Sequence, residues 1–75
     1  MIENTYTQPT ILRLPDVLRT VGLSRPHVYR MIRAGEFPQQ VRLSPGAVGW
    51  LRSEVEGWLT GRVSARDVAA GKLAA

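Results

Sequence analysis

The 75-residue sequence contains no cysteine and only one histidine. It can therefore form neither a disulfide framework nor a thiolate metal site, and one histidine cannot build a zinc site alone. No apolar run of about 18 residues is present, so no membrane-spanning helix is predicted. The first ten residues, MIENTYTQPT, lack the basic and apolar segments of a secretory signal. These absences predict a soluble, cytoplasmic protein that uses no metal or cofactor and does not enter a membrane.

Positive charge is concentrated in the middle of the chain. Ten Lys and Arg residues against six Asp and Glu residues give a net charge of +4. Between Arg13 and Arg52, seven arginines stand against only Asp16 and Glu36, so this segment alone has a net charge of +5. Arginine suits the planar, bidentate recognition of phosphate and of guanine edges. The segment is therefore a candidate DNA-binding region, with a simple solvated surface as the alternative.

A first short helix is predicted to begin near Pro15, because proline is well tolerated in a first helical turn. Val17, Leu18 and Val21 follow at a spacing that gives this helix one apolar face. Gly22 is expected to end it.

A second helix is predicted to begin at its N-cap, Ser24, with Pro26 in the first turn. Gly35 is expected to end this helix as the residue after the C-cap. Its inward stripe comprises Val28, Met31 and Ile32. Two short helices joined by a three-residue turn form a helix-turn-helix.

The sequence pattern changes after residue 38. Two β-prone runs, Val41–Leu43 and Ala47–Leu51, surround Ser44-Pro45-Gly46. Proline followed by glycine at the centre of a turn suits type II geometry, since glycine can take the positive φ. A β-hairpin is therefore predicted, and beside a helix-turn-helix it would form a wing.

A third helix is predicted from an N-cap at Ser53, with Glu54 and Glu56 in its first turn and Gly61 as its end. The chain is then organised as a loose arm over residues 1–10, a folded domain over residues 11–61, and an Ala-rich tail over residues 62–75 that is flexible or marginally helical. The predicted fold is mainly α with a small β-hairpin: a winged helix-turn-helix of three short helices and a two-stranded wing.

The second helix carries long donors on the face that its apolar stripe leaves free, and it has no acid before Glu36. A helix face that carries only positive charge is typical of a helix that enters the DNA major groove. The predicted contact residues on this helix are Ser24, Arg25, Pro26, His27, Tyr29, Arg30 and Arg33. Those on the wing are Arg42, Ser44 and Gly46, facing the adjacent backbone or the minor groove, and Arg13 and Arg19 are candidates for further backbone contacts.

Residues 11–59 also resemble the AlpA-type prophage regulators, which are related to excisionases and to the MerR-type winged helix. The matching landmarks are Arg13-Leu14, GLSR and VYRMI within 22–32, GEFP at 35–38 and VGWLRSEVEGWL at 48–59. The resemblance implies a nucleoid-associated bacterial DNA binder, encoded on a mobile element, that acts as an excisionase in DNA recombination, as a transcriptional regulator, or as both. A site-specific integrase would then be a partner. Pro26-His27 stand where the family usually has small hydroxyl residues, which implies a different base preference.

Alternative interpretations remain for the chain as a whole. Ser24, His27 and Asp16 form a formal catalytic triad, but Ser24 is better placed as a helix cap, and so small a chain has little room for a closed pocket. A module whose basic face meets an acidic protein is the other alternative. Self-association along DNA, through the arm or the tail, is expected because one such module buries little surface on its own.

Several side chains also have structural interpretations. Tyr29 can pack against the first helix instead of contacting phosphate. Trp50 and Trp58 are expected to be packing anchors, and Arg52 is expected to pair with Glu56 at the i, i+4 spacing.

Overall fold

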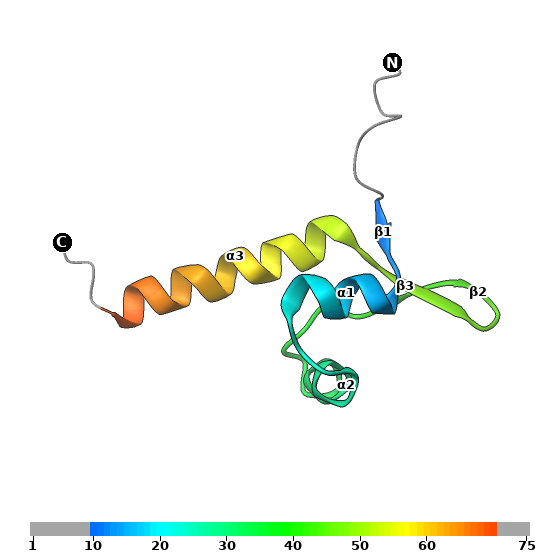
Figure 1. The fold of residues 1–75 in the computed structure, drawn as a ribbon, viewed down its shortest axis with the longest axis horizontal. Coiled ribbons are helices and arrows are strands. Elements are labelled where there is room, and N and C mark those ends of the chain that lie inside the picture. Colours follow the sequence, from blue (N-terminus) through cyan, green and yellow to red (C-terminus); the bar gives the residue numbers. More distant parts are fainter. Residues whose placement is uncertain (1–9, 71–75) are drawn as a thin grey trace, which may run out of the picture.

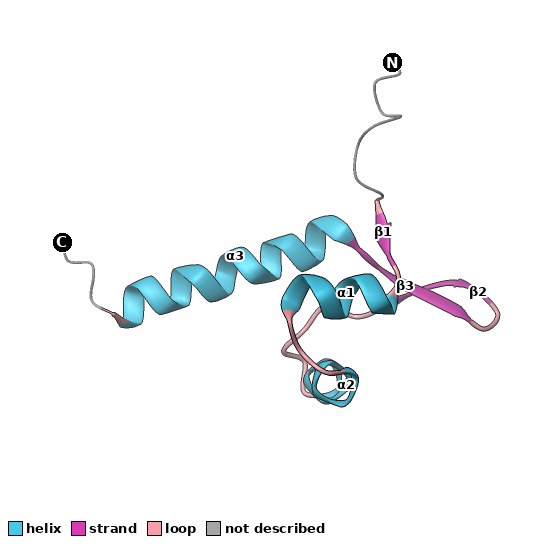
Figure 2. Cartoon of the chain, viewed as in Figure 1, coloured by secondary structure: helices cyan, strands magenta, loops and turns pink. Residues whose placement is uncertain are grey.

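A computed structural model describes residues 10–70 of the chain (Figure 1). The predicted arm over residues 1–10 and the last part of the predicted tail, residues 71–75, therefore lie almost wholly outside the described residues. The described elements, in chain order, are β1 (Ile11–Leu12), α1 (Leu14–Val21), α2 (Arg25–Arg33), β2 (Val41–Ser44), β3 (Ala47–Leu51) and α3 (Arg52–Ala69). Three helices and a small antiparallel sheet confirm the predicted fold class (Figure 2).

The helix-turn-helix has the boundaries that its capping residues predict. α1 begins with proline in its first turn and ends at Gly22, which adopts the left-handed conformation with φ 72°. At the start of α2, the Ser24 hydroxyl accepts the backbone N–H of His27 at 3.4 Å. Gly35, with φ 76°, follows the C-cap Ala34. Each helix end is thus set by a residue that satisfies backbone groups or permits positive φ.

The hairpin is confirmed, with one strand more than predicted. β2 and β3 pair antiparallel around Pro45-Gly46, and Gly46 has the positive φ (81°) that a type II turn requires. β1 adds a third strand on the other edge of β3, so the sheet order is β1-β3-β2. Gly49 permits this close approach, because a Cβ there would lie 2.5 Å from a side-chain carbon of Ile11.

Two predictions about the third helix are wrong. α3 begins at Arg52 after the N-cap Leu51, which makes no side-chain capping hydrogen bond, so Ser53 lies inside the helix. The backbone N–H of Arg52 donates instead to the carbonyl oxygen of Thr10 at 2.7 Å, beside the start of β1. Thr10 thus satisfies one of the backbone N–H groups at the start of α3 that have no partner inside the helix.

Gly61 does not end α3, which continues for eight further residues to Ala69. Glycine in a helix interior costs only about 1 kcal/mol relative to alanine, and no proline follows it. The segment 62–69, predicted as flexible or marginally helical, is therefore helical. All of its residues are exposed, and it extends away from the rest of the domain (Figure 1).

The core brings together residues of β1, β3 and the three helices around Trp50, whose side chain is fully buried. Its Nε1 donates to the carbonyl oxygen of Pro38 at 3.1 Å, so the polar end of the indole is satisfied. The other core residues are Leu12, Val17, Val28, Ile32, Phe37 and Val55. Trp58 is half-buried, lies edge-on to Phe37 with 4.9 Å between ring centroids, and donates to the carbonyl oxygen of Glu36. Both tryptophans are packing anchors, as predicted.

Candidate nucleic-acid interface

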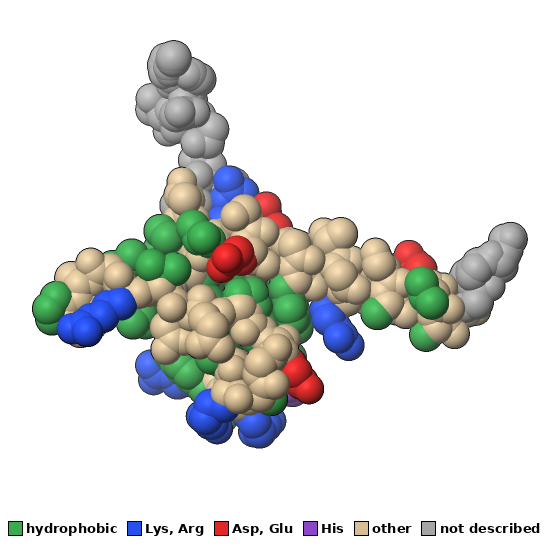
Figure 3. Space-filling model, turned by 180° about the vertical axis from the view of Figure 1, so that it is seen from behind, with side chains coloured by type: hydrophobic (Ala, Val, Ile, Leu, Met, Phe, Trp, Pro, Cys, Tyr) green, Lys and Arg blue, Asp and Glu red, His purple; other side chains and the backbone are tan. Residues whose placement is uncertain are grey.

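The helix α2 divides into a buried face and a basic face. Val28 and Ile32 are buried in the core, while Arg25, Arg30 and Arg33 are exposed. Arg30 and Arg33 are three residues apart, and Arg33 is eight residues from Arg25, so the three guanidinium groups lie around one side of the helix. In Figure 3, basic side chains gather at the lower end of the molecule, over α2, and one more lies on the hairpin.

The arginines on this side have no protein partner within residues 10–70. No hydrogen bond, ion pair or ring contact involves the side chains of Arg25, Arg30, Arg33 or Arg42 in this part of the chain. Clustered cations that are not neutralised by nearby acids create a positive potential suited to an anionic ligand.

The wing carries the fourth of these arginines. Arg42 lies on β2 opposite Val48, next to an irregularity in the register between Arg42 and Ser44. Ser44 and Gly46 are exposed at the tip of the hairpin. These three predicted contact residues are thus available at the surface.

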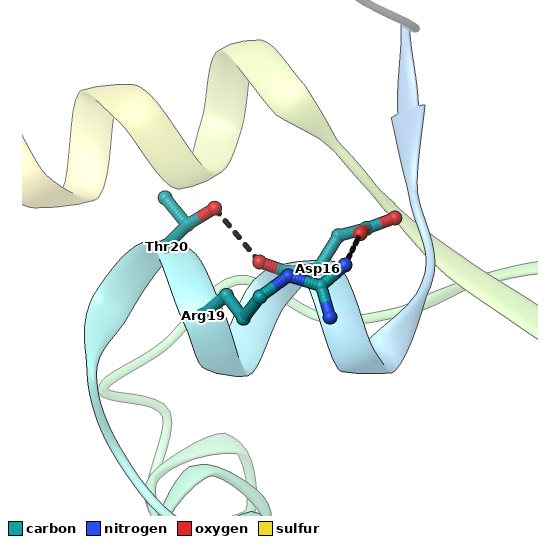
Figure 4. Close-up of polar contacts among 3 residues, drawn as sticks. All are labelled: Asp16, Arg19 and Thr20. Carbon is teal, nitrogen blue, oxygen red and sulfur yellow. Dashed lines mark hydrogen bonds and ion pairs between the residues drawn. The ribbon is translucent and has the colours of Figure 1, made fainter.

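The two arginines predicted to contact the DNA backbone from α1 and its entrance both have partners. The Nε of Arg13 donates to the carbonyl oxygen of Val48 at 2.9 Å, which ties the start of α1 to the hairpin. Arg19 pairs with the carboxylate of Asp16, and the Thr20 hydroxyl donates to the Asp16 carbonyl oxygen at 2.7 Å (Figure 4). Arg13 contributes to the fold as well as to the surface, and Arg19 is engaged by an acid of its own helix.

The remaining predicted residues lie at the start of α2 or are partly buried in the fold. Ser24 is the N-cap and Pro26 lies in the first turn. His27 and Tyr29 are half-buried. The Tyr29 ring lies edge-on to Trp50 of β3, with 6.4 Å between the centroids, a contact that the helical pattern of α2 gave no means of predicting.

A groove of about 490 Å³ separates the start of α1, the start of α2 and the hairpin. It is lined by Arg13, Leu14, Pro15, Leu18, Arg25, Tyr29, Gly46 and Val48. Its aliphatic residues were missed as site residues by the sequence analysis. Their apolar side chains suggest core positions, and no sequence signal indicates that they line a groove.

The formal triad of Asp16, Ser24 and His27 is not assembled. Ser24 accepts a backbone N–H as a helix cap, and the Asp16 carboxylate is paired with Arg19. Among residues 10–70, no group of three His, Asp or Glu side chains is placed to hold a metal ion. No helix in this same part of the chain is long and apolar enough to cross a membrane.

A family model described as the prophage CP4-57 regulatory protein (AlpA) matches residues 10–63. The chain belongs to the AlpA family of prophage regulatory proteins. This result confirms the resemblance seen in the sequence, and the matched residues cover β1, the helix-turn-helix, the wing and most of α3. The AlpA family is one of regulators and not of enzymes, so the chain is not an enzyme.

Two relatives of this AlpA-family chain are known by sequence. An uncharacterized protein, ORF88, of Enterobacteria phage P4 is 50% identical over 60 residues, covering 80% of this chain and 68% of the relative. The DNA-binding transcriptional activator AlpA of Escherichia coli (strain K12) is 31% identical over 65 residues, covering 79% of this chain and 93% of the relative.

Proposed function

We propose that this AlpA-family protein binds duplex DNA sequence-specifically and regulates transcription from a mobile element. α2 lies in the major groove, and the hairpin contacts the adjacent backbone or the minor groove. The observation that carries the proposal is the set of four arginines on α2 and β2 without a protein partner within residues 10–70. The E. coli relative is named a DNA-binding transcriptional activator, which supports the same function.

The geometry of α2 suits major-groove docking. Arg25 and Pro26 at its start are exposed, and its buried side is fixed to the core by Val28 and Ile32. A helix held in this way can present its N-terminal residues to base edges while a second element holds the backbone. This function would place the protein in the cytoplasm, on the bacterial nucleoid.

Binding to duplex DNA is tested by measuring affinity at a series of salt concentrations, with polyglutamate as a second polyanion. Each phosphate contact contributes about −0.9 to the slope of log K against log salt, so three to five contacts give a slope of roughly −3 to −4.5 per monomer. Duplex DNA should bind far more tightly than polyglutamate at equal charge. Equal binding of the two polymers would favour the protein-interaction alternative, and a flat salt response would reject DNA binding.

The family relation leaves two roles on DNA, regulation of transcription and excision as a recombination directionality factor with a site-specific integrase. Footprinting across the mobile element separates them. Protection over a promoter supports the regulator, and protection beside an attachment site supports the excisionase. Protection at both places would assign both roles to the protein.

We also propose that several copies bind side by side on DNA. A single winged module buries only roughly 600–1,000 Å² of its own surface, which limits its selectivity. Segment 62–69 of α3 is exposed throughout, and Val63 and Val68 are 47% and 78% exposed. Neighbours that contact through this segment would raise each other's effective concentration. A protein truncated after Gly61 should then lose the gain in per-site affinity that DNA with several sites gives over DNA with one site.

A further inference from the structure

Of residues 10–70, those that line the groove between α1, α2 and the hairpin are donors and apolar side chains, with no acid among them. Arg13, Arg25 and Tyr29 line it together with the aliphatic residues Leu14, Leu18 and Val48. The acid of the first turn of α1, Asp16, is engaged by Arg19 (Figure 4). The charged side chains that line the groove are therefore all positive.

Both guanidinium groups of the groove have donors to spare within residues 10–70. Arg13 uses only its Nε, toward the carbonyl oxygen of Val48, and this bond fixes the guanidinium beside the hairpin. Arg25 has no polar partner in the same part of the chain. Planar guanidinium groups bind phosphate oxygens in a bidentate manner, and two of them on one groove suit a single phosphate group.

Tyr29 adds a third donor in a fixed position. It follows Arg25 by four residues, so the two side chains share a face of α2. Its ring is held edge-on to Trp50, which is fully buried. A phenol fixed by its ring can direct its hydroxyl without losing much conformational freedom.

We propose that this groove binds one phosphodiester of duplex DNA through Arg13, Arg25 and Tyr29, with the adjoining sugar against the aliphatic residues. The proposal rests on the proposed DNA binding, and it adds which residues hold the DNA backbone. If α2 occupies the major groove and the hairpin lies on the adjacent backbone, the strand between them must pass this groove. Arg25 then anchors the backbone, and base reading falls to other residues of α2.

The test compares Arg25→Gln and Tyr29→Phe with Arg52→Gln, which removes an arginine that is ion-paired with Glu56 at the start of α3. Affinity is measured on a duplex selected from a random library and on unselected duplex. Arg25→Gln should weaken binding to both by about the same factor, about 10-fold, and reduce the salt slope by about 0.9. Tyr29→Phe, which keeps the ring packing, should weaken both by about 3-fold. Arg52→Gln should change either by less than about 2-fold.

A methylphosphonate scan of the selected duplex locates the contact, since each substitution neutralises one phosphate. Wild-type protein should lose about 10-fold in affinity at one position where Arg25→Gln loses less than about 2-fold, while losses at other positions persist. The inference is overturned if Arg25→Gln affects only the selected duplex, because Arg25 would then read bases. It is also overturned if Arg25→Gln and Arg52→Gln behave alike.

Two further results distinguish a failure of this inference from a failure of the proposed DNA binding. If wild-type protein shows no salt-dependent binding to any duplex, the proposed function itself fails. Sodium phosphate should displace DNA from the wild-type protein more strongly than sodium chloride of equal ionic strength, because free phosphate competes for the same guanidinium groups. This excess should be lost in Arg25→Gln, and an equal excess in both proteins would overturn the inference.

Discussion

The nine arginines of the chain fall into two groups that differ in what they contact. Those on α2 and β2 have no protein partner within residues 10–70, whereas those on α1 and α3 and at the start of α1 all have one. The partnered arginines are Arg13 with the Val48 carbonyl, Arg19 with Asp16, Arg52 with Glu56, Arg62 with the Trp58 ring, and Arg66 with Asp67.

This difference separates charge that the fold uses from charge that remains for a ligand. An exposed ion pair contributes at most about 1 kcal/mol to stability, but it satisfies its arginine locally. The four guanidinium groups on α2 and β2 carry like charges, and no acid within residues 10–70 is paired with them. Their placement is therefore best explained by an anionic partner on that side of the molecule.

The largest expected effect tests whether one core holds α2 and the hairpin together. Trp50→Ala removes a fully buried side chain and its contact with Tyr29, and should lower the free energy of unfolding by about 3–5 kcal/mol. Trp58→Ala, at a half-buried position, should cost clearly less. Chemical denaturation followed by circular dichroism measures both. Equal losses would show that the core is not centred on Trp50.

The next largest effect tests whether the arginines of α2 and β2 bind DNA. Arg30→Ala should weaken binding to the selected duplex by about 1–3 kcal/mol, because its exposed guanidinium has no protein partner within residues 10–70 and would lose only DNA contacts. The free energy of unfolding should stay within about 0.5 kcal/mol of the wild type. Fluorescence anisotropy and urea denaturation provide the two values. Unchanged affinity would remove Arg30 from the interface.

Arg13 is predicted to belong to both groups. Arg13→Gln should lower the free energy of unfolding by about 1 kcal/mol, through loss of the hydrogen bond to the Val48 carbonyl, and should also weaken DNA binding. Parallel measurements of denaturation and anisotropy test the two effects. A loss of affinity without any loss of stability would show that the bond to Val48 contributes nothing to the fold.

The smallest effect is expected for an arginine that has a partner within the protein. Arg52→Ala removes the ion pair with Glu56 and should cost only a few tenths of a kcal/mol in stability. Affinity for duplex DNA should change by less than about 2-fold. A change in affinity as large as that of Arg30→Ala would end the distinction between the two groups.

Local sequence signals were sufficient for the helix-turn-helix and the hairpin turn. Ser24, Gly22, Gly35 and Gly46 each perform the backbone role that their residue type predicts. The ion pair of Arg52 with Glu56 was also predictable, since it depends only on helical spacing.

Contacts between distant residues could not be predicted in this way. β1 contains two residues and exists because Ile11 pairs with Leu51, far along the chain. The same pairing places the Thr10 carbonyl on the first N–H of α3, which is why Ser53 is not the cap. The bond from Arg13 to Val48 likewise depends on tertiary placement. Which of the predicted site residues touch DNA stays a prediction.

The most direct test of the division between the two groups compares two triple variants with the same change in net charge. One replaces Arg30, Arg33 and Arg42 with glutamine, and the other replaces Arg19, Arg62 and Arg66. The slope of log K against log salt on duplex DNA should fall by up to about 2.7 for the first variant and by less than about 1 for the second. Equal slopes for the two variants would contradict the account, because any arginine would then serve as well as another.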